Sequence, residues 1–366
     1  MASKRAERAR SEAQPSEVHA GGPATMRAAQ ARGREQIEIG RIPIPEPAPG
    51  EVRVRLLACG ICGSDLHFHH AGLWPAGTTP GHEMAGEIDA LGDGVRGLAE
   101  GDRVAIEPFR TCGVCAECLA GQPVRCRELR ILGIHCGGGL AEFVSVPSHR
   151  AFRVPADLDP RVAALTEPMA VAVHGLRRGG LGAGQRVLVL GAGTIGLLTA
   201  LAARELGAGE VLVTARHPHQ AELASALGAA RVLREPEADE HGLRSLAHDL
   251  PIDLVVETVG GSADTLRLAV HAIRPGGSVC VLGLFLSPVT LDPLPLLLKE
   301  ASLIWSNCYA RAPGEPDFAT ATRLVASHRS RLAHLVTHSV PLDEVARGFA
   351  LASDKKSGAV KVSVLP

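Results

Sequence analysis

The sequence predicts a two-domain α/β protein with a β-rich first part and a parallel α/β second part. The chain has 366 residues, and with about 100–200 residues per domain two domains fit this length. Residues 35–61 and 86–108 alternate apolar with polar side chains around Pro- and Gly-rich turns, which is typical of strands. From Gln185 onward, an apolar run, Gly191-x-Gly193-x-x-Gly196 and a helical pattern follow one another, which indicates a strand, a tight turn and a helix of a doubly wound sheet.

The composition favours small-molecule chemistry. The formal net charge is −1, so no basic footprint for nucleic acid or for an anionic membrane is visible. Only 3% of the residues are aromatic, which argues against a stacking platform for single strands. The 46% apolar content and 41 glycines suit an α/β protein with many tight turns.

Residues 1–25 predict a disordered N-terminal extension, because they are polar and contain almost nothing that a core could bury. They include no apolar segment of a secretory signal, so we expect a cytoplasmic protein. The longest uncharged run, Val187 to Ala203, is shorter than the ~20 residues of a membrane-spanning helix. The folded part is predicted to begin near Met26.

A catalytic metal site is predicted in residues 58–83, where thiol, hydroxyl, carboxylate and imidazole groups gather. Zinc is held by thiolate and imidazole, and a catalytic zinc keeps a fourth position open. Cys62 and His82 are therefore the first two predicted ligands. Cys59 also forms a Cys-x-x-Cys with Cys62, and a redox pair is the alternative, although no βαβ unit surrounds it.

A second metal site is predicted from four cysteines spaced by two, two and seven residues: Cys112, Cys115, Cys118 and Cys126. Four thiolates on one loop close a tetrahedral shell around zinc, which makes the site structural. An iron–sulfur cluster is the rival interpretation, but its fourth cysteine would follow after three residues and precede a proline. Here Arg127 follows it.

The chain resembles the zinc-dependent medium-chain dehydrogenases, in particular the sorbitol and threonine dehydrogenase branch. Cys62, Ser64, Asp65, His67 and the Gly81-His82-Glu83 run carry this resemblance, which extends from about Met26 to the C-terminus. It implies that Cys62 and His82 bind the catalytic zinc, that Ser64 passes on the substrate proton, that His67 delivers it to solvent, and that Asp65 orients the histidine ligand. It also implies a GroES-like β-barrel domain and a second zinc in the four-cysteine lobe.

Two acidic residues are candidates for the third ligand of the catalytic zinc. Glu167 precedes Pro168 in a helical pattern, and the resemblance implies that an acid there lies on the zinc, directly or through water. Glu83 competes for the same role. Alternatively, Glu167 is a partly solvated acid in the first turn of a helix. His174 is interpreted as a packing or interface histidine.

The second part of the chain predicts a dinucleotide site. In the turn, Gly191 allows the tight bend, Gly193 the approach of a pyrophosphate, and Gly196 the packing of helix on strand; Thr194 and Ile195 between them are also predicted to contact the cofactor. Later strand and helix patterns extend the sheet to about Trp305. We expect a Rossmann domain at 161–305 and a discontinuous catalytic domain at 26–160 and 306–366.

The end of the second strand favours NADP over NAD. NAD-binding sheets place an acid about 20 residues after the glycines, but Ala215 and Arg216 stand here. An arginine forms charge-assisted hydrogen bonds to a 2′-phosphate. The alternative is that Arg216 is a solvated turn residue, so that NAD serves as well.

These features predict an enzyme with two zinc ions per chain that oxidises an alcohol or polyol and transfers hydride to NAD(P). The resemblance implies that the substrate group is a secondary hydroxyl, which becomes a ketone. The alternatives are a zinc-free NADPH-dependent reductase of the same fold and a non-catalytic cofactor-binding protein with only the structural zinc. The expected partner is a small molecule, without nucleic acid or membrane, and the resemblance implies a dimer or tetramer.

Overall fold

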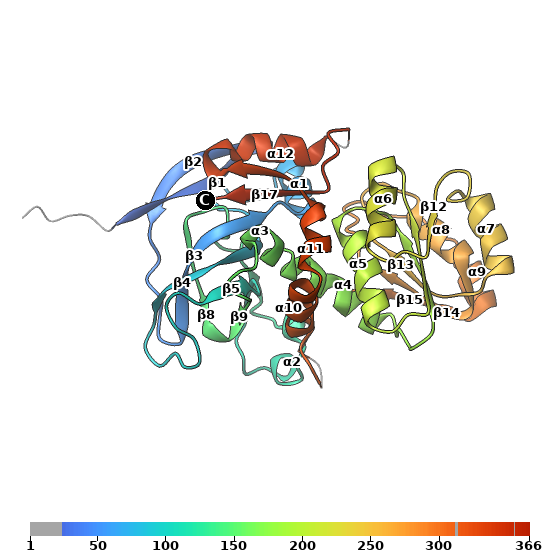
Figure 1. The fold of residues 1–366 in the computed structure, drawn as a ribbon, viewed down its shortest axis with the longest axis horizontal. Coiled ribbons are helices and arrows are strands. Elements are labelled where there is room, and N and C mark those ends of the chain that lie inside the picture. The colour runs from blue at the N-terminus through green and yellow to red at the C-terminus, as the bar shows by residue number, and fades with distance from the viewer. Residues whose placement is uncertain (1–23, 312–313, 355) are drawn as a thin grey trace, which may run out of the picture.

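The computed structural model describes residues 24–311, 314–354 and 356–366, and these form two lobes side by side (Figure 1). One lobe contains the first strands of the chain and its C-terminus, and the other contains a parallel sheet with helices around it. The chain enters the second lobe and then returns to the first, because its last two strands join the N-terminal sheet.

The first lobe is built on antiparallel strands. A hairpin of β1 (Thr25–Gly33) and β2 (Gln36–Pro43) lies beside a seven-stranded sheet. This sheet contains β3 (Glu51–Gly60), β4 (Glu83–Leu91), β5 (Arg103–Ile106), β8 (Phe143–Pro147), β9 (Ala151–Arg153), β16 (Val336–Pro341) and β17 (Lys361–Leu365). In β3 the alternate residues Val52, Val54 and Leu56 are buried, as the period of two predicts.

Shorter elements complete the first lobe. They are α1 (Gly63–Ala71), β6 (Phe109–Arg110), α2 (Ala116–Leu119), β7 (Arg130–Ile131), α3 (Pro160–Ala163), α10 (Asp317–Ser327), α11 (Arg329–Leu332) and α12 (Val345–Ser353). Four single 3₁₀ turns connect them at Pro123–Arg125, Ser148–Arg150, Ala333–Leu335 and Leu342–Glu344. Among these elements, α1 is the one that directly follows Cys62, which is its N-cap residue.

The second lobe is a doubly wound sheet, as predicted. Its strands are β10 (Arg186–Leu190), β11 (Glu210–Thr214), β12 (Arg231–Leu233), β13 (Ile252–Glu257), β14 (Ile273–Val281) and β15 (Ser302–Trp305). They are all parallel, in the order β12-β11-β10-β13-β14-β15, which is the Rossmann order. The helices are α5 (Thr194–Glu205), α6 (Pro218–Ala226), α7 (Glu240–Asp249), α8 (Thr265–Ala272) and α9 (Leu294–Lys299).

Two sequence expectations need correction at their boundaries. The pattern of residues 266–277 predicts a helix between two strands of the parallel sheet. In the structure this helix ends at Ala272 and β14 begins with the next residue, because Pro275 cannot continue a helix and Gly276 has a positive φ. The extension predicted at residues 1–25 lies outside the described residues up to Pro23, but Thr25 pairs with Pro43 in β1.

Helix α4 (Thr166–Arg178) lies where the two lobes meet. Its buried residues Met169, Val173 and Leu176 pack in one core with Ala58 of the first sheet and Val189 of the second. On the opposite face of the parallel sheet, Leu188 and Leu190 belong to a separate core. The first turn of α4, which carries Glu167, is therefore fixed at the junction of the lobes. The domain limits 26–160, 161–305 and 306–366 remain a proposal.

No helix within the described ranges combines the length and the apolar character needed to cross a membrane.

Substitution of the third glycine of the turn tests its packing. A Cβ on Gly196 would overlap the carbonyl oxygen of Gly191 and lie 2.9 Å from Thr258 Oγ1. We expect Gly196→Ala to destabilise the protein by about 1–3 kcal/mol, as overpacking usually does, and to weaken NADPH binding. Urea unfolding and NADPH fluorescence measure the two effects.

Gly193→Ala is the matched control, because no heavy atom lies within 4 Å of its added Cβ. It should unfold like the parent protein yet bind NADPH more weakly, since the methyl group would stand where a pyrophosphate approaches. If Gly196→Ala is as stable as the parent, the close packing is not the reason for this glycine.

Candidate active site

Strand pairing brings the predicted ligands of the catalytic zinc together. Strands β3 and β4 are antiparallel, with Gly60 opposite Glu83, so the residues after β3 and at the start of β4 are neighbours. Sγ of Cys62, a ring nitrogen of His82 and a carboxylate oxygen of Glu83 all lie within 4.8 Å of one another. Thiolate, imidazole and carboxylate are zinc ligands, so these three side chains fit a zinc ion.

Asp65 holds two of these side chains in place. Its Oδ2 accepts a hydrogen bond from the backbone N–H of Cys62 at 2.9 Å, and its Oδ1 lies 3.4 Å from Nδ1 of His82. Burial lowers the pKa of His82, but Asp65 and Cys62 outweigh burial and raise this pKa well above its usual value. With Nδ1 facing Asp65, the other ring nitrogen is left for a metal, in the manner of a carboxylate–histidine–metal triad.

Lys361 completes the centre and was missed by the sequence analysis. Its Nζ lies 2.7 and 2.6 Å from the two carboxylate oxygens of Glu83 and donates to the carbonyl of Ile61 at 3.1 Å. Lys361 is 3% and Glu83 1% exposed. Burial lowers the pKa of Lys361, but Glu83 and Cys62 raise it overall, so the lysine keeps its charge. The alternation of residues 358–366 would place Lys361 on the polar face of its strand, so the sequence carried no signal for this contact.

Glu167 lies close to the three donors but outside their group. It is 5% exposed. Burial, and to a smaller extent the charge of Glu83, raise its pKa to about 7 although His82 acts in the opposite direction. Tyr309 also lies close enough to act on this carboxyl. The structure thus buries Glu167 fully and does not leave it as a partly solvated first-turn acid.

The residues predicted to relay the substrate proton, Ser64 and His67, lie on α1. Ser64 is in its first turn and is partly buried. His67 follows one turn later, and a Cβ added to Gly261 of the second lobe would lie 3.9 Å from Cε1 of its ring. His67 therefore lies close to the second lobe.

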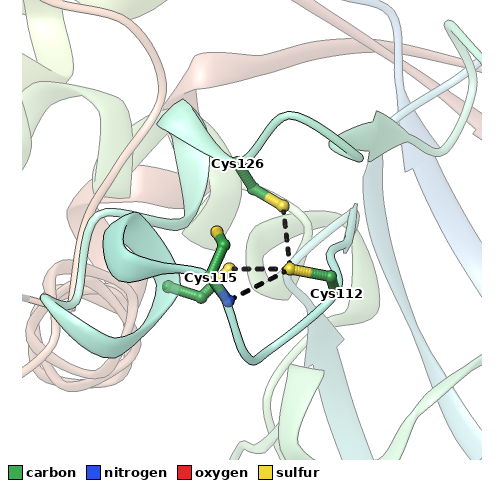
Figure 2. A group of neighbouring side chains, drawn as sticks. Cys112, Cys115 and Cys126 are labelled. Carbon is green, nitrogen blue, oxygen red and sulfur yellow. Dashed lines mark hydrogen bonds between the residues drawn. The ribbon is translucent and has the colours of Figure 1, made fainter.

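The four-cysteine lobe converges as its spacing predicts (Figure 2). The sulfur atoms of Cys112, Cys115, Cys118 and Cys126 lie within 4.8 Å of one another. Sγ of Cys112 is 3.5 Å from that of Cys126 and 4.0 Å from that of Cys118. Backbone N–H groups of Val114 and Cys115 lower the pKa of Cys112 to about 7. The loop is therefore shaped to hold thiolates around an ion, and four thiolates fit zinc.

One cleft joins the catalytic donors to the glycine-rich turn. A cavity of about 1090 Å³ is lined by Cys62, Glu83 and Lys361 and also by Gly191, Gly193, Thr194 and Ile195. Gly191 has a φ of 104°, which glycine tolerates best, and Gly193 is the N-cap of α5. Gly196 lies behind this turn, inside the packing of α5.

The far end of the cleft contains Ala215, Arg216 and His217. Ala215 is buried and Arg216 is exposed, so a cation stands where an NAD-specific sheet would present an acid. Arg234, which follows β12, lines the same end. The sequence analysis missed Arg234 because only the order of the strands places β12 beside β11.

Removal of the lysine tests the buried ion pair. We expect Lys361→Met to destabilise the protein by about 3–5 kcal/mol, because Glu83 is left buried without its cation. The double variant Lys361→Met/Glu83→Gln should recover most of this loss. Urea unfolding at equal zinc content measures the three proteins.

The exposed pair of Arg347 and Glu344 supplies the control. Arg347→Met should change the stability by less than about 1 kcal/mol, since surface ion pairs contribute little. Equal stability of Lys361→Met and the parent would show that the buried pair does not hold this centre together.

Comparison with known proteins agrees with this geometry. Residues 48–156 match the family model of the alcohol dehydrogenase GroES-like domain, and residues 194–327 match that of the zinc-binding dehydrogenases. The chain is 32% identical to L-threonine 3-dehydrogenase of Pyrococcus horikoshii, over 92% of this chain and 97% of that protein. It is 31% identical to sorbitol dehydrogenase of Bacillus subtilis, over 94% and 98%.

Among solved structures, a zinc-binding dehydrogenase of Sinorhizobium meliloti bound to NADP superposes with a TM-score of 0.83 at 34% identity, covering 94% of this chain and all of that one (100%). Both lobes are thus matched together, and so is their arrangement along the chain. The chain belongs to the zinc-dependent medium-chain dehydrogenase family, with relatives in its sorbitol and threonine dehydrogenase branch.

Proposed function

We propose that this protein oxidises a secondary hydroxyl of an alcohol or polyol to a ketone and transfers the hydride to NADP. One observation carries the proposal: Cys62 and Glu83, two of the three converging donors, line the same cavity as the glycine-rich turn. A metal-bound alcohol and a nicotinamide would therefore meet in one cleft. Membership of the family supports the reaction class, and the named relatives act on hydroxyl compounds such as threonine and sorbitol.

The catalytic zinc would be held by Cys62, His82 and Glu83, whose donor atoms already converge. When bound, zinc supplies Lewis acidity that lets a hydroxyl lose its proton near neutral pH. Asp65 keeps His82 oriented, and Lys361 balances the charge of Glu83. Glu167 lies beside the three donors, and we assign it to the hydrogen bonding of the substrate hydroxyl or of a water.

The substrate proton would leave through α1. We assign Ser64 to accept it and His67 to pass it on, because α1 extends from the metal donors toward the second lobe. A hydroxyl and an imidazole within one helical turn of each other form a short path for general acid–base chemistry.

The alternative functions fit the centre less well. A zinc-free reductase has no need of a thiol and an imidazole brought together as those of Cys62 and His82 are, with a buried carboxylate, Asp65, contacting the Cys62 backbone N–H and the His82 ring. A cofactor-binding protein with one structural zinc would use only the four-cysteine lobe. Counting the zinc ions therefore separates these functions.

A homo-oligomer is also proposed, in keeping with the expected dimer or tetramer. Strand β15 is the edge of the parallel sheet, and its Trp305 is 52% exposed. Leu297 and Leu298 of the neighbouring α9 are 72% and 75% exposed. An open edge with exposed apolar side chains is suited to pairing with a second copy.

Two cysteine substitutions test the catalytic function. Cys62→Ala should abolish turnover but keep NADPH binding and one zinc per chain, because neither the cleft's glycine turn nor the lobe uses Cys62. Cys115→Ser should lower the melting temperature and zinc content, since a closed zinc site contributes folding energy. Zinc analysis, melting curves and the absorbance of reduced nicotinamide with polyols, hydroxy amino acids and aminocyclitols give the readouts.

Cys136 lies outside both donor groups, so Cys136→Ser serves as the control with parent activity and two zinc ions. Turnover by Cys62→Ala within a few-fold of the parent would rule out this catalytic metal. An unchanged zinc content in Cys115→Ser would instead remove the structural site.

Arg216 tests the proposed preference for NADP. A charge-assisted hydrogen bond to the 2′-phosphate contributes about 1.5–3 kcal/mol, so Arg216→Ala should lose about tenfold or more in kcat/KM with NADP and little with NAD. Arg204→Ala is the matched control, because Arg204 lies on α5 and donates to the carbonyl of Gly209 at 3.0 Å. A parent enzyme that prefers NAD, with no change in the variant, would refute the assignment.

A further inference from the structure

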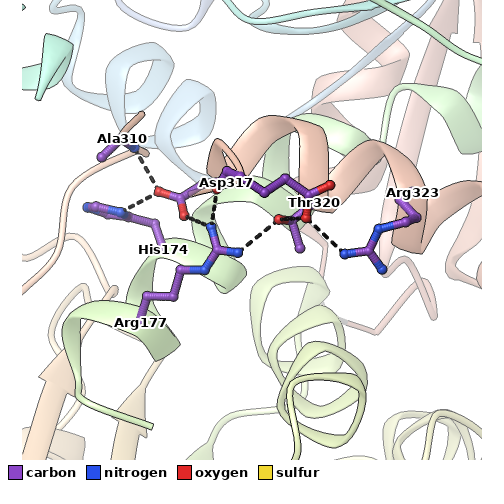
Figure 3. Close-up of polar contacts among 7 residues, drawn as sticks. His174, Arg177, Ala310, Asp317, Thr320 and Arg323 are labelled. Carbon is purple, nitrogen blue, oxygen red and sulfur yellow. Dashed lines mark hydrogen bonds and ion pairs between the residues drawn. The ribbon is translucent and has the colours of Figure 1, made fainter. Parts of the chain in front are cut away.

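Asp317, the first residue of α10, is a buried carboxylate with partners from two other segments (Figure 3). It is 4% exposed. Nδ1 of His174 lies 2.7 Å and Nη1 of Arg177 2.6 Å from its two oxygens, and both side chains come from α4. The backbone N–H of Ala310 donates to the same oxygen as His174 at 2.8 Å. One carboxylate therefore ties together α4, α10 and the segment around Ala310.

The outer side of this cluster fastens α4 to α10 alone. Nη2 of Arg177 donates to Oγ1 of Thr320 at 2.9 Å. Glu315 accepts from Thr320 at 2.7 Å and from Arg323 at 2.9 Å. Among the described residues, the Glu315 carboxylate makes no hydrogen bond to Ala310. Glu315 therefore joins only side chains of the outer network, whereas Asp317 also holds the Ala310 segment.

The segment that Asp317 holds leads to the candidate metal centre. Tyr309 directly precedes Ala310, is 1% exposed, and stacks on Phe109 with ring centroids 4.7 Å apart. Its buried hydroxyl has no hydrogen-bond partner in the part of the chain that is described, and it lies close enough to Glu167 for the two groups to perturb each other. A substrate hydroxyl or a water between them would satisfy this orphan group.

Tyr309 and Glu167 belong to two parts of the chain that Asp317 connects. Glu167 is in the first turn of α4, two turns before His174. On the other side, Arg311 fixes the segment to Glu107 at 2.6 Å and to the carbonyl of His149 at 2.7 Å. Without Asp317, nothing in these contacts would fix the segment to α4.

A charged group is suited to this task. Burial raises the pKa of Asp317, but His174 and the Ala310 N–H lower it overall, so the carboxylate is ionised. An ionised oxygen accepts stronger and more directional bonds than a neutral one, whereas apolar packing would leave the segment free to slide.

We propose that Asp317 is a positioning residue for the substrate side of the active site: through Ala310 it fixes Tyr309 against α4, so that the Tyr309 hydroxyl and Glu167 face one another. This inference rests on the proposed dehydrogenase function. It identifies a residue that touches neither metal donors nor cofactor cleft yet decides how well the alcohol is held.

Asp317→Asn tests the inference, since it keeps the shape but places an amide N–H₂ against at least one N–H donor. We expect kcat/KM for the alcohol to fall about tenfold to hundredfold, the usual effect of a misplacement of about 1 Å. KM for NADP should stay within about twofold. With cobalt in place of zinc, the visible spectrum should shift, because Glu167 is no longer held in its place.

Glu315→Gln is the matched control: it weakens the same network on the outer side and should change the melting temperature without changing alcohol kinetics or the cobalt spectrum. If Asp317→Asn does not fold, His174→Gln, which removes one partner of the carboxylate, should give a smaller effect in the same direction.

The inference is wrong if the variant melts earlier but keeps the parent's alcohol KM, kcat and cobalt spectrum, because Asp317 is then only a structural anchor. It is also wrong if Glu315→Gln produces the same kinetic loss. A parent protein without zinc-dependent alcohol oxidation would defeat the proposed function, while the cobalt spectra of parent and variant would still decide whether Asp317 positions Glu167.

Discussion

The buried ion pair between Glu83 and Lys361 is the contact on which the architecture of the active site depends. Glu83 begins β4 and Lys361 begins β17, and their charged atoms meet at 2.6 Å. Desolvating either charge alone is costly, so the C-terminal strand must return to this place to give the buried Glu83 its partner. The pair also forms one end of the dinucleotide cleft. Because of this ion pair, the metal donors are fully assembled only when the C-terminal strand β17 has joined the first sheet.

The two groups of metal donors show opposite ways to build a site. The four cysteines come from one loop of residues 112–126, and its own backbone N–H groups stabilise a thiolate. The catalytic donors come from the end of β3 and the start of β4, and they need Asp65, Lys361 and Glu167 from three further elements. A local loop suits a closed structural site, whereas donors from separate elements leave one side open for substrate.

Helix α4 lies between the two lobes and contacts both of them. Its apolar residues pack with both sheets, its first turn presents Glu167, and its later turns bind Asp317. Since interiors are closely packed, a shift of this helix would be felt in the metal centre and in the cleft together. The position of the substrate side therefore depends on contacts made two helical turns away from it.

The sequence by itself determined the features that short-range chemistry encodes. Alternation predicted the strands of the first lobe, the Gly191 turn predicted the doubly wound sheet, and the spacing of Cys112 to Cys126 predicted a loop that gathers four thiols, because each depends on residues close in the chain. Cys62 and His82 were also found this way, as each stands in a short motif.

Only the tertiary structure decided which distant groups complete these motifs. Lys361 meets Glu83 across 278 residues, and His174 meets Asp317 across 143. Arg234 joins Arg216 at the end of the cleft because β12 lies beside β11. No periodicity records such pairings. They follow from strand order and from the need to give every buried charge a partner, and both are settled only when the whole chain is folded.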